Sequence, residues 1–397
     1  MRKRRVYIIM ENKETNYNLD YNNNGATTED WPPKCQQNPD TALVVNEGVE
    51  EKPIINPYIK RFFKKKPSLL SVEEYMKGIT EGNTTILSQA ITLVESYLPA
   101  HREIAQKIIA QCQLISSQKK SMRIGITGVP GAGKSTFIEA FGSYITGKGH
   151  KLAVLAIDPS SEKTKGSILG DKTRMETLCN DPNAFIRPSP SAGSLGGVAR
   201  KTRETVLLCE AAGYDVIFIE TVGVGQSETA VHSMSDFFLL LMLSGAGDDL
   251  QGIKRGIMEM SDLIAITKAD GTNVEKANMA RALYANALHL FPPTESTWVP
   301  TALTSSAVTK AGLPEILAKI EEYFELVKGN GYYERKRRQQ AEYWMYESIN
   351  EALKNNFYEN TTIAARLEDY KDAVLEGKMD SFMAAGELMD LYNRLKA

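Results

Sequence analysis

The stretch Gly128-Val-Pro-Gly-Ala-Gly-Lys-Ser135 constrains the fold of this chain more than any other feature. It matches the pattern G-x-x-x-x-G-K-[ST], follows a β-prone run at 123–127 and precedes a segment of helical character. Glycines in such a loop let successive backbone N–H groups turn inward around phosphate oxygens, and the following helix adds its positive dipole end. The alternative is a chance Gly-rich loop, but the full match in a strand–helix context favours a phosphate-binding loop (P-loop).

The P-loop assigns a role to each of its residues. Lys134 supplies a point charge to the β- and γ-phosphates, and Ser135 offers its hydroxyl to Mg²⁺. The expected nucleotide contacts are Gly128, Val129, Pro130, Gly131, Ala132, Gly133, Lys134, Ser135 and Thr136.

Further apolar runs alternate with segments of helical character. Four runs without polar alternation, which suit strands buried on both faces, are 152–157, 216–219, 237–243 and 263–266. Helix-like segments lie between them, for example 135–147, 198–212 and 274–290. This alternation predicts an α/β fold, a P-loop NTPase three-layer sandwich with a mostly parallel sheet, and polar residues at the strand ends face the ligand.

Composition excludes several protein classes. The 397 residues carry 47 Lys and Arg against 49 Asp and Glu, a formal charge of −2, so we expect no nucleic-acid partner. The four cysteines are scattered without a CxxC pair, which argues against a zinc cluster or a disulfide framework. No apolar run approaches the ~20 residues of a membrane span, and the apolar stretch at 6–10 is too short for a signal peptide. We expect a cytoplasmic protein without a membrane partner.

The chain divides into four predicted parts. These are a disordered or loosely attached arm at 1–55, a helical N-terminal extension at 56–120, a P-loop domain at 121–328 and a C-terminal helical region at 329–397. The basic stretch Lys60–Lys66 is either a solvated linker whose two Phe dock on the body, which we favour, or a contact to nucleic acid or an anionic surface. The C-terminal helices either cap the core or form a subunit interface, and we favour the interface.

A second motif indicates which nucleotide base the protein binds. Thr267-Lys268-Ala269-Asp270 closes a strand where GTPases carry N/T-K-x-D. The Asp270 carboxylate can accept from the ring N–H and the 2-amine of guanine, whereas adenine would leave it unpaired at a cost of ~1–3 kcal/mol. The stem of Lys268 can cover the base ring. Ser306, Ala307 and Val308 fit the second base-contacting loop. We therefore expect GTP and GDP as ligands.

Several acidic residues are candidates for binding Mg²⁺ and for activating the water in hydrolysis. Glu220-Thr-Val-Gly223 occupies the third GTPase motif, where Glu220 can reach Mg²⁺ through water and Gly223 can bond the γ-phosphate. Asp158 and Asp171 could serve the Mg²⁺ shell or activate water; helix capping and a surface salt bridge are their respective alternatives. Gln226 either orients a water or is an exposed loop residue.

Together these segments resemble a known family. Gly128–Thr136, 158–161, 166–175, 181–188, 220–228 and 247–254 look like the MeaB/MMAA/ArgK family, the methylmalonyl-CoA mutase-associated GTPase chaperones. The string Glu-Thr-Val-Gly-Val-Gly-Gln-Ser-Glu at 220–228 is the most specific of them. The resemblance runs from about residue 55 to the C-terminus.

The resemblance implies a homodimer whose C-terminal helices form the interface. It implies that GTP gates the delivery of adenosylcobalamin to methylmalonyl-CoA mutase, or a related mutase, and that the chaperone protects this enzyme. By position, Asp158, Asp171 and Glu220 match the family's acidic residues around Mg²⁺. Asp248, Gln251 and Lys254 match a third switch that responds to the partner, with Lys254 supplying charge to the transition state. A solvated loop lysine is the alternative for Lys254.

Two other functions compete with this interpretation. Relatives of the same Glu-motif class insert nickel or cobalt, but no His-rich or Cys-rich tract is present to carry metal. A small-molecule kinase could also use a P-loop, yet it would need no Gly-Val-Gly-Gln switch. Protein-kinase signatures, H-R-D and D-F-G, are absent from the sequence.

Overall fold

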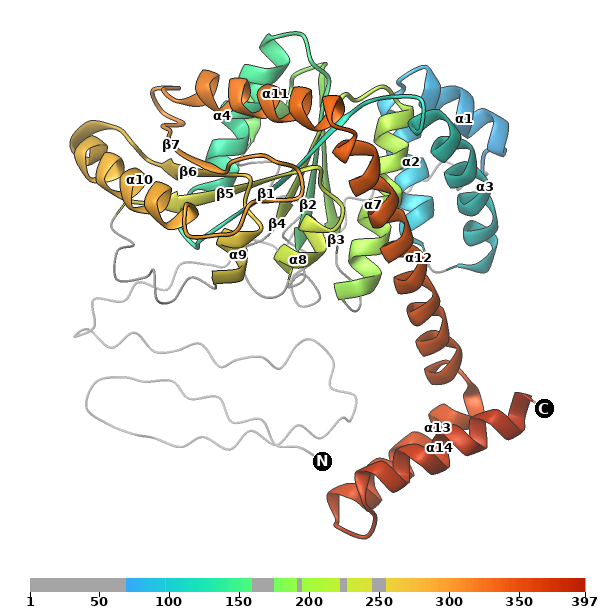
Figure 1. Ribbon diagram of the computed structural model, residues 1–397. Coiled ribbons are helices and arrows are strands. Elements are labelled where there is room, and N and C mark those ends of the chain that lie inside the picture. Colours follow the sequence, from blue (N-terminus) through green and yellow to red (C-terminus); the bar gives the residue numbers. More distant parts are fainter. Residues whose placement is uncertain are drawn as a thin grey trace, which may run out of the picture. The chain divides into compact units, whose positions relative to one another are not determined.

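A parallel sheet of seven strands forms the centre of the computed structural model, which describes residues 69–96, 98–158, 175–190, 195–221, 227–244 and 255–396 (Figure 1). The strand order is β3-β2-β4-β1-β5-β6-β7, and all neighbouring strands are parallel. The strands are β1 (Met122–Gly128), β2 (Leu152–Asp158), β3 (Ala184–Pro190), β4 (Val216–Thr221), β5 (Phe237–Leu243), β6 (Leu263–Thr267) and β7 (Thr301–Thr304). The predicted α/β class with a parallel sheet is confirmed.

Helices cover both faces of the sheet, because alternate strand residues point to opposite sides. In β5, Phe237 and Leu239 share an apolar cluster with α4, whereas Phe238 packs with α7 and Leu240 with α10. The first face carries α4 (Lys134–Gly147), α6 (Glu176–Cys179) and α11 (Leu313–Gly329). The second carries α7 (Leu195–Ala211), α8 (Ser227–His232), α9 (Arg255–Glu259) and α10 (Val274–Leu288).

The predicted helical extension precedes the sheet as α1 (Val72–Thr80), α2 (Thr84–Glu95) and α3 (Pro99–Ser116). Ser71 and Glu74 form a capping box at the start of α1, and the Asn83 side chain caps α2. All three helices pack against α7. Pro99 is the first residue of α3, where its missing N–H costs no hydrogen bond.

Strand β3 was not among the predicted strands. Its sequence, Ala-Phe-Ile-Arg-Pro-Ser-Pro, contains two prolines, which argue against a central strand. The structure places β3 at the edge of the sheet, next to β2 alone. An edge strand needs only one side of its backbone for pairing, so the prolines are tolerated there.

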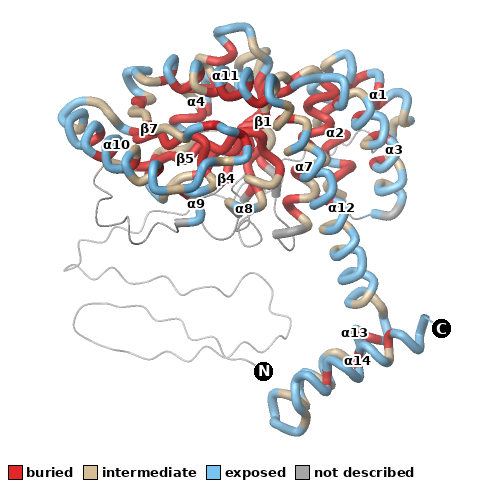
Figure 2. Tube along the Cα trace, viewed as in Figure 1, coloured by how far each residue is buried: buried red, intermediate tan, exposed pale blue. Residues whose placement is uncertain are grey.

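The C-terminal region consists of α12 (Tyr332–Tyr358), α13 (Thr361–Leu375) and α14 (Ser381–Lys396). A turn with Gly377 at φ +69° separates α13 from α14, and these two helices pack on each other. Buried residues of α12 lie only in its first half, and the second half is exposed (Figure 2). No helix among the described residues is long and apolar enough to cross a membrane.

Candidate nucleotide site

The P-loop connects the carboxyl end of β1 to the start of α4. Gly131 and Gly133 have φ values of +81° and +79°, a conformation that other residues adopt only with strain. A Cβ atom on Gly128 would lie 2.5 Å from the carbonyl oxygen of Leu241. The loop therefore presents backbone rather than side chains, as a phosphate cradle requires.

Lys134, the first residue of α4, folds back across the P-loop. Its Nζ donates to the carbonyl oxygen of Gly128 at 3.0 Å. Burial lowers the pKa of Lys134, and the charges of Glu220 and Glu228 oppose this change. A partly buried ammonium group that spans the loop places positive charge where phosphate oxygens would bind.

Two predicted acidic positions reach the same edge of the sheet. Glu220 lies near the end of β4, in register with Ile126 of β1, and is 5% exposed. Asp158 ends β2, the other neighbour of β4. The Ser135 hydroxyl and carboxylates at these strand ends are oxygen ligands of the kind that Mg²⁺ prefers. The side chain of Asp158 is not among those that the structure describes. Among the described side chains, no group of three or more His, Cys, Asp or Glu is placed to hold a metal ion.

Six predicted site residues fall outside the described residues and stay predictions. They are Asp171, Gly223, Gln226, Asp248, Gln251 and Lys254.

The structure brings the two expected base-contacting loops together. The Ser306 hydroxyl donates to Oδ2 of Asp270 at 2.5 Å and accepts from the Thr309 N–H at 3.1 Å. The N–H of Ala269 donates to the carbonyl oxygen of Ser305 at 3.0 Å. These bonds hold the Asp270 carboxylate in one orientation. Ala307 and Val308 continue the second loop, and the Val308 side chain is exposed.

Thr267 has a role that its place in the motif does not reveal. Its buried hydroxyl lies 2.8 Å from the carbonyl oxygen of Ala132 and 3.1 Å from that of Met242. One of these contacts reaches the P-loop and the other reaches β5. The hydroxyl thus ties the base loop to the phosphate loop. The sequence predicted Thr267 only as part of the base-reading motif Thr267-Lys268-Ala269-Asp270.

Asn273, which no sequence motif indicated, forms a hydrogen bond to the backbone of the base loop. Lys268 has a φ of +57°, uncommon for a residue with a side chain. Its carbonyl oxygen accepts from Nδ2 of Asn273 at 2.7 Å, and Oδ1 of Asn273 accepts from the Ser244 hydroxyl at 2.6 Å. The Lys268 Cε atom lies 3.8 Å from the position that a Cβ of Gly133 would occupy. The lysine stem therefore lies beside the P-loop.

Comparison with known proteins decides the family. A family model described as "Methylmalonyl Co-A mutase-associated GTPase MeaB" matches residues 87–362, more than half of the chain. The chain belongs to the MeaB family. That match includes the P-loop, both base loops and α12.

Individual relatives agree with this membership. A probable GTPase of Mycobacterium tuberculosis is 45% identical over 323 residues, 81% of this chain and 96% of the relative. The methylmalonic aciduria type A homolog, mitochondrial, of Mus musculus is 42% identical over 329 residues, 81% of this chain and 79% of the relative. A crystal structure titled LAO/AO transport system kinase has a TM-score of 0.64 and 36% identity, and the match covers 82% of this chain and all of that one. This MeaB-family chain is therefore a GTPase that binds GTP and GDP.

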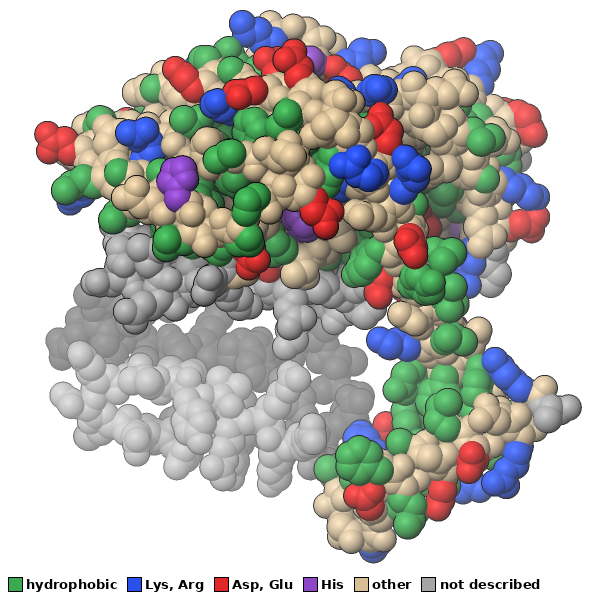
Figure 3. Space-filling model, in the orientation of Figure 1, with side chains coloured by type: hydrophobic (Ala, Val, Ile, Leu, Met, Phe, Trp, Pro, Cys, Tyr) green, Lys and Arg blue, Asp and Glu red, His purple; other side chains and the backbone are tan. Residues whose placement is uncertain are grey.

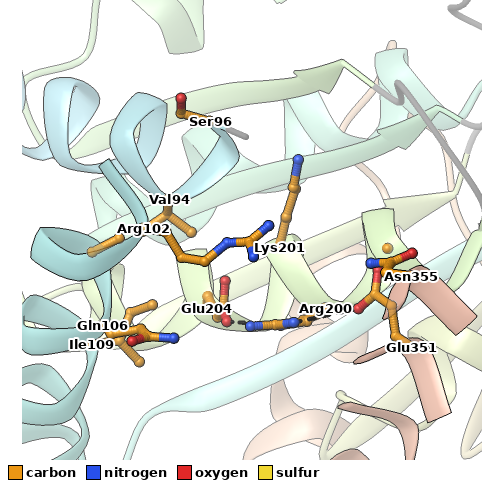
Figure 4. Close-up of a pocket in the computed structure, with 12 residues that line it drawn as sticks. Val94, Ser96, Arg102, Gln106, Ile109, Arg200, Lys201, Glu204, Glu351 and Asn355 are labelled. Atoms are coloured by element: carbon orange, nitrogen blue, oxygen red, sulfur yellow. Dashed lines mark hydrogen bonds and ion pairs between the residues drawn. The ribbon is translucent and has the colours of Figure 1, made fainter. Parts of the chain in front are cut away.

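A cleft of about 70 Å³ lies elsewhere in this MeaB-family fold, between α2, α3, α7 and α12 (Figure 4). Charged side chains line it, and Arg200 contacts Glu204 of its own helix at 3.1 Å and Glu351 of α12 at 3.5 Å. The cleft lining includes none of the predicted nucleotide-site residues that the structure describes. It is a charged junction between α7 and α12.

Proposed function

We propose that this GTPase is a chaperone that gates adenosylcobalamin delivery to methylmalonyl-CoA mutase, or to a closely related cobalamin-dependent mutase, and protects that enzyme. The observation that supports this proposal most is the family match, whose description names association with methylmalonyl-CoA mutase and which spans both the nucleotide site and α12. The name of the mouse relative, which refers to methylmalonic aciduria, points to the same metabolism.

In this proposal the nucleotide lies along the carboxyl ends of β1, β4 and β6. P-loop N–H groups and Lys134 hold the phosphates, and Asp270 selects guanine. Ser135, Glu220, Asp158 and Asp171 would hold Mg²⁺, which neutralises phosphate charge when bound. The acidic side chains among these residues would also orient the water that attacks the γ-phosphate.

The proposed switch residues are Gly223, Gln226, Asp248, Gln251 and Lys254, which follow β4 and β5 in sequence. We propose that they report the γ-phosphate to the mutase, and that Lys254 adds positive charge in the transition state. These roles rest on the resemblance in sequence.

We also propose a homodimer in the cytoplasm, with the four-part division of the chain retained. The second half of α12 exposes Tyr346, Ile349 and Leu353 on one face, and α14 exposes Phe382 and Met389. Apolar side chains gather over these helices (Figure 3). Such an apolar surface fits an interface with a second copy.

The test measures phosphate release from GTP and from ATP, with and without purified methylmalonyl-CoA mutase. We expect hydrolysis of GTP over ATP, faster with the mutase, and GTP-dependent association of the two proteins. Lys134→Ala serves as the control and should lose hydrolysis. Label transferred to a small-molecule acceptor would favour a kinase. GTP hydrolysis with no response to the mutase would contradict the chaperone role and leave the GTPase intact.

A further inference from the structure

Side chains from the first half of α12 form hydrogen bonds with the turn between α8 and β5, residues Ser233–Asp236. Nε2 of Gln340 donates to the carbonyl oxygen of Ser235 at 2.8 Å, and Nε1 of Trp344 donates to that of Ser233 at 3.3 Å. Nζ of Lys336 donates to the carbonyl oxygen of Asp236 at 2.8 Å. Three side chains of one helix thus donate hydrogen bonds to three of the four carbonyl groups of this turn.

A bidentate ion pair fixes the end of the same turn. Arg337 contacts the two carboxylate oxygens of Asp236 at 3.0 and 2.7 Å. Asp236 also accepts from the backbone N–H of Arg123, the second residue of β1, at 3.0 Å. The turn, the start of β1 and α12 are therefore joined by direct bonds.

The turn Ser233–Asp236 lies against β1, the strand that leads into the P-loop. A Cβ on Gly125 of β1 would lie 2.8 Å from each of three side-chain atoms, on Val231 of α8, Ser235 of the turn and Phe238 of β5. Helix α8 also contacts β4, the strand that carries Glu220. A shift of this turn would press directly on β1 and, through α8, on β4, the strands that carry the phosphate and metal side of the site.

Gln340 has a feature that stability alone does not explain. It is 6% exposed, and within the described part of the chain its Oε1 has no hydrogen-bond partner. Burying an unpaired amide oxygen is unfavourable, and a Met of similar length would avoid this cost. Gln340 donates a hydrogen bond from Nε2 to the turn, and a Met at this position has no donor to do so.

We propose that Gln340, supported by Trp344, is a positioning residue for GTP hydrolysis: α12 holds the α8–β5 turn so that β1 and β4 present the P-loop and Glu220 in productive geometry. Because the exposed second half of the same helix leads to α13 and α14, a partner bound there would alter the hydrolysis rate through these hydrogen bonds. The proposal rests on the established GTPase activity and not on the identity of the mutase.

The test compares Gln340→Met with Gln339→Met, the same substitution at the exposed neighbouring position. Steady-state GTP hydrolysis, GDP affinity and thermal unfolding are measured on the full chain. We expect Gln340→Met to fold with near-parental stability, to keep KM and GDP affinity within about twofold, and to lose kcat by about five- to tenfold, as expected for misplaced groups. Gln339→Met should match the parent.

Trp344→Phe provides a second variant that keeps ring packing but removes the indole N–H. We expect a smaller fall in kcat with KM again unchanged. The proposal is overturned if both variants keep kcat within about twofold of Gln339→Met. It is also overturned if kcat falls only in parallel with GDP affinity and thermal stability, because that pattern indicates a merely structural role.

Discussion

At the residue scale, the pKa of one largely buried histidine departs far from its ordinary value. His232, the last residue of α8, packs edge-on against Phe238 at 5.4 Å between ring centroids. Burial, with a smaller effect from the charge of Lys336, lowers the pKa of His232 from 6.5 to about 4. The folded protein therefore keeps this imidazole neutral at pH values where the unfolded chain binds a proton.

This difference predicts a loss of stability in acid. Since the pKa is lower in the folded state, the contribution of His232 is complete above pH 6.5 and is lost as the pH falls towards 4. Between pH 7 and pH 5 it should cost about 2 kcal/mol of unfolding free energy. Chemical denaturation of the parent and of His232→Gln measures this. A smaller pH dependence in the variant is expected, and equal profiles would contradict the shifted pKa.

The P-loop and the Asp270 motif could be predicted from sequence because each is set by a short local pattern. The partners of Thr267 and Asn273 could not, since their hydrogen bonds reach Ala132 and Ser244, which lie far away along the chain or follow another strand. No spacing rule connects such positions. The same limit applies to Gln340, whose partner Ser235 precedes it by 105 positions.

At the element scale, one buried carboxylate joins the ends of α7, β1 and α12. Glu210 contacts Arg123 at 2.7 Å and Arg337 at 3.4 Å, and it accepts hydrogen bonds from Ser116 and Ser121. Burial would raise the pKa of Glu210, but the charge and hydrogen bonds of Arg123 and the charge of Arg337 lower it to about 2. The ionised carboxylate is thus the form that the fold requires.

Breaking this contact should destabilise the whole protein. Glu210→Gln takes the carboxylate away from the buried guanidinium of Arg123, while Arg337 keeps Asp236, and we expect a loss of about 3–5 kcal/mol in unfolding free energy. Glu103→Gln, which removes the exposed partner of Lys107, is the control and should leave stability unchanged. Urea denaturation of both variants measures the difference. An equal, small effect at both positions would show that Glu210 is not a structural anchor.

Element positions were predictable where periodicity is strong and less so elsewhere. The central strands read as continuous apolar runs because both faces of the parallel sheet are covered. Strand β3 lacks this signal because it lies at the sheet edge and carries Pro188 and Pro190. The break between α13 and α14 depends on the turn at Gly377, which a helical pattern on both sides obscured.

At the scale of the whole molecule, the exposed face of α12 belongs to the proposed dimer interface. Replacing Ile349 and Leu353 together by Glu should separate the subunits, because charged groups would enter an apolar interface. Light scattering is expected to give about twice the chain mass of 44.0 kDa for the parent and a single chain mass for the variant. Leu290→Glu, at an exposed position after α10, is the control. A monomeric parent would contradict the proposed dimer.

Guanine selection by Asp270 beside a P-loop is the central claim, and calorimetric titration of the parent and Asp270→Asn with GDP and XDP tests it most directly. The parent should bind GDP over XDP by about 100-fold or more, since a carboxylate accepts two hydrogen bonds from guanine. The variant should reverse this order, because the amide supplies one donor and one acceptor. Unchanged GDP affinity in the variant would show that another residue reads the base.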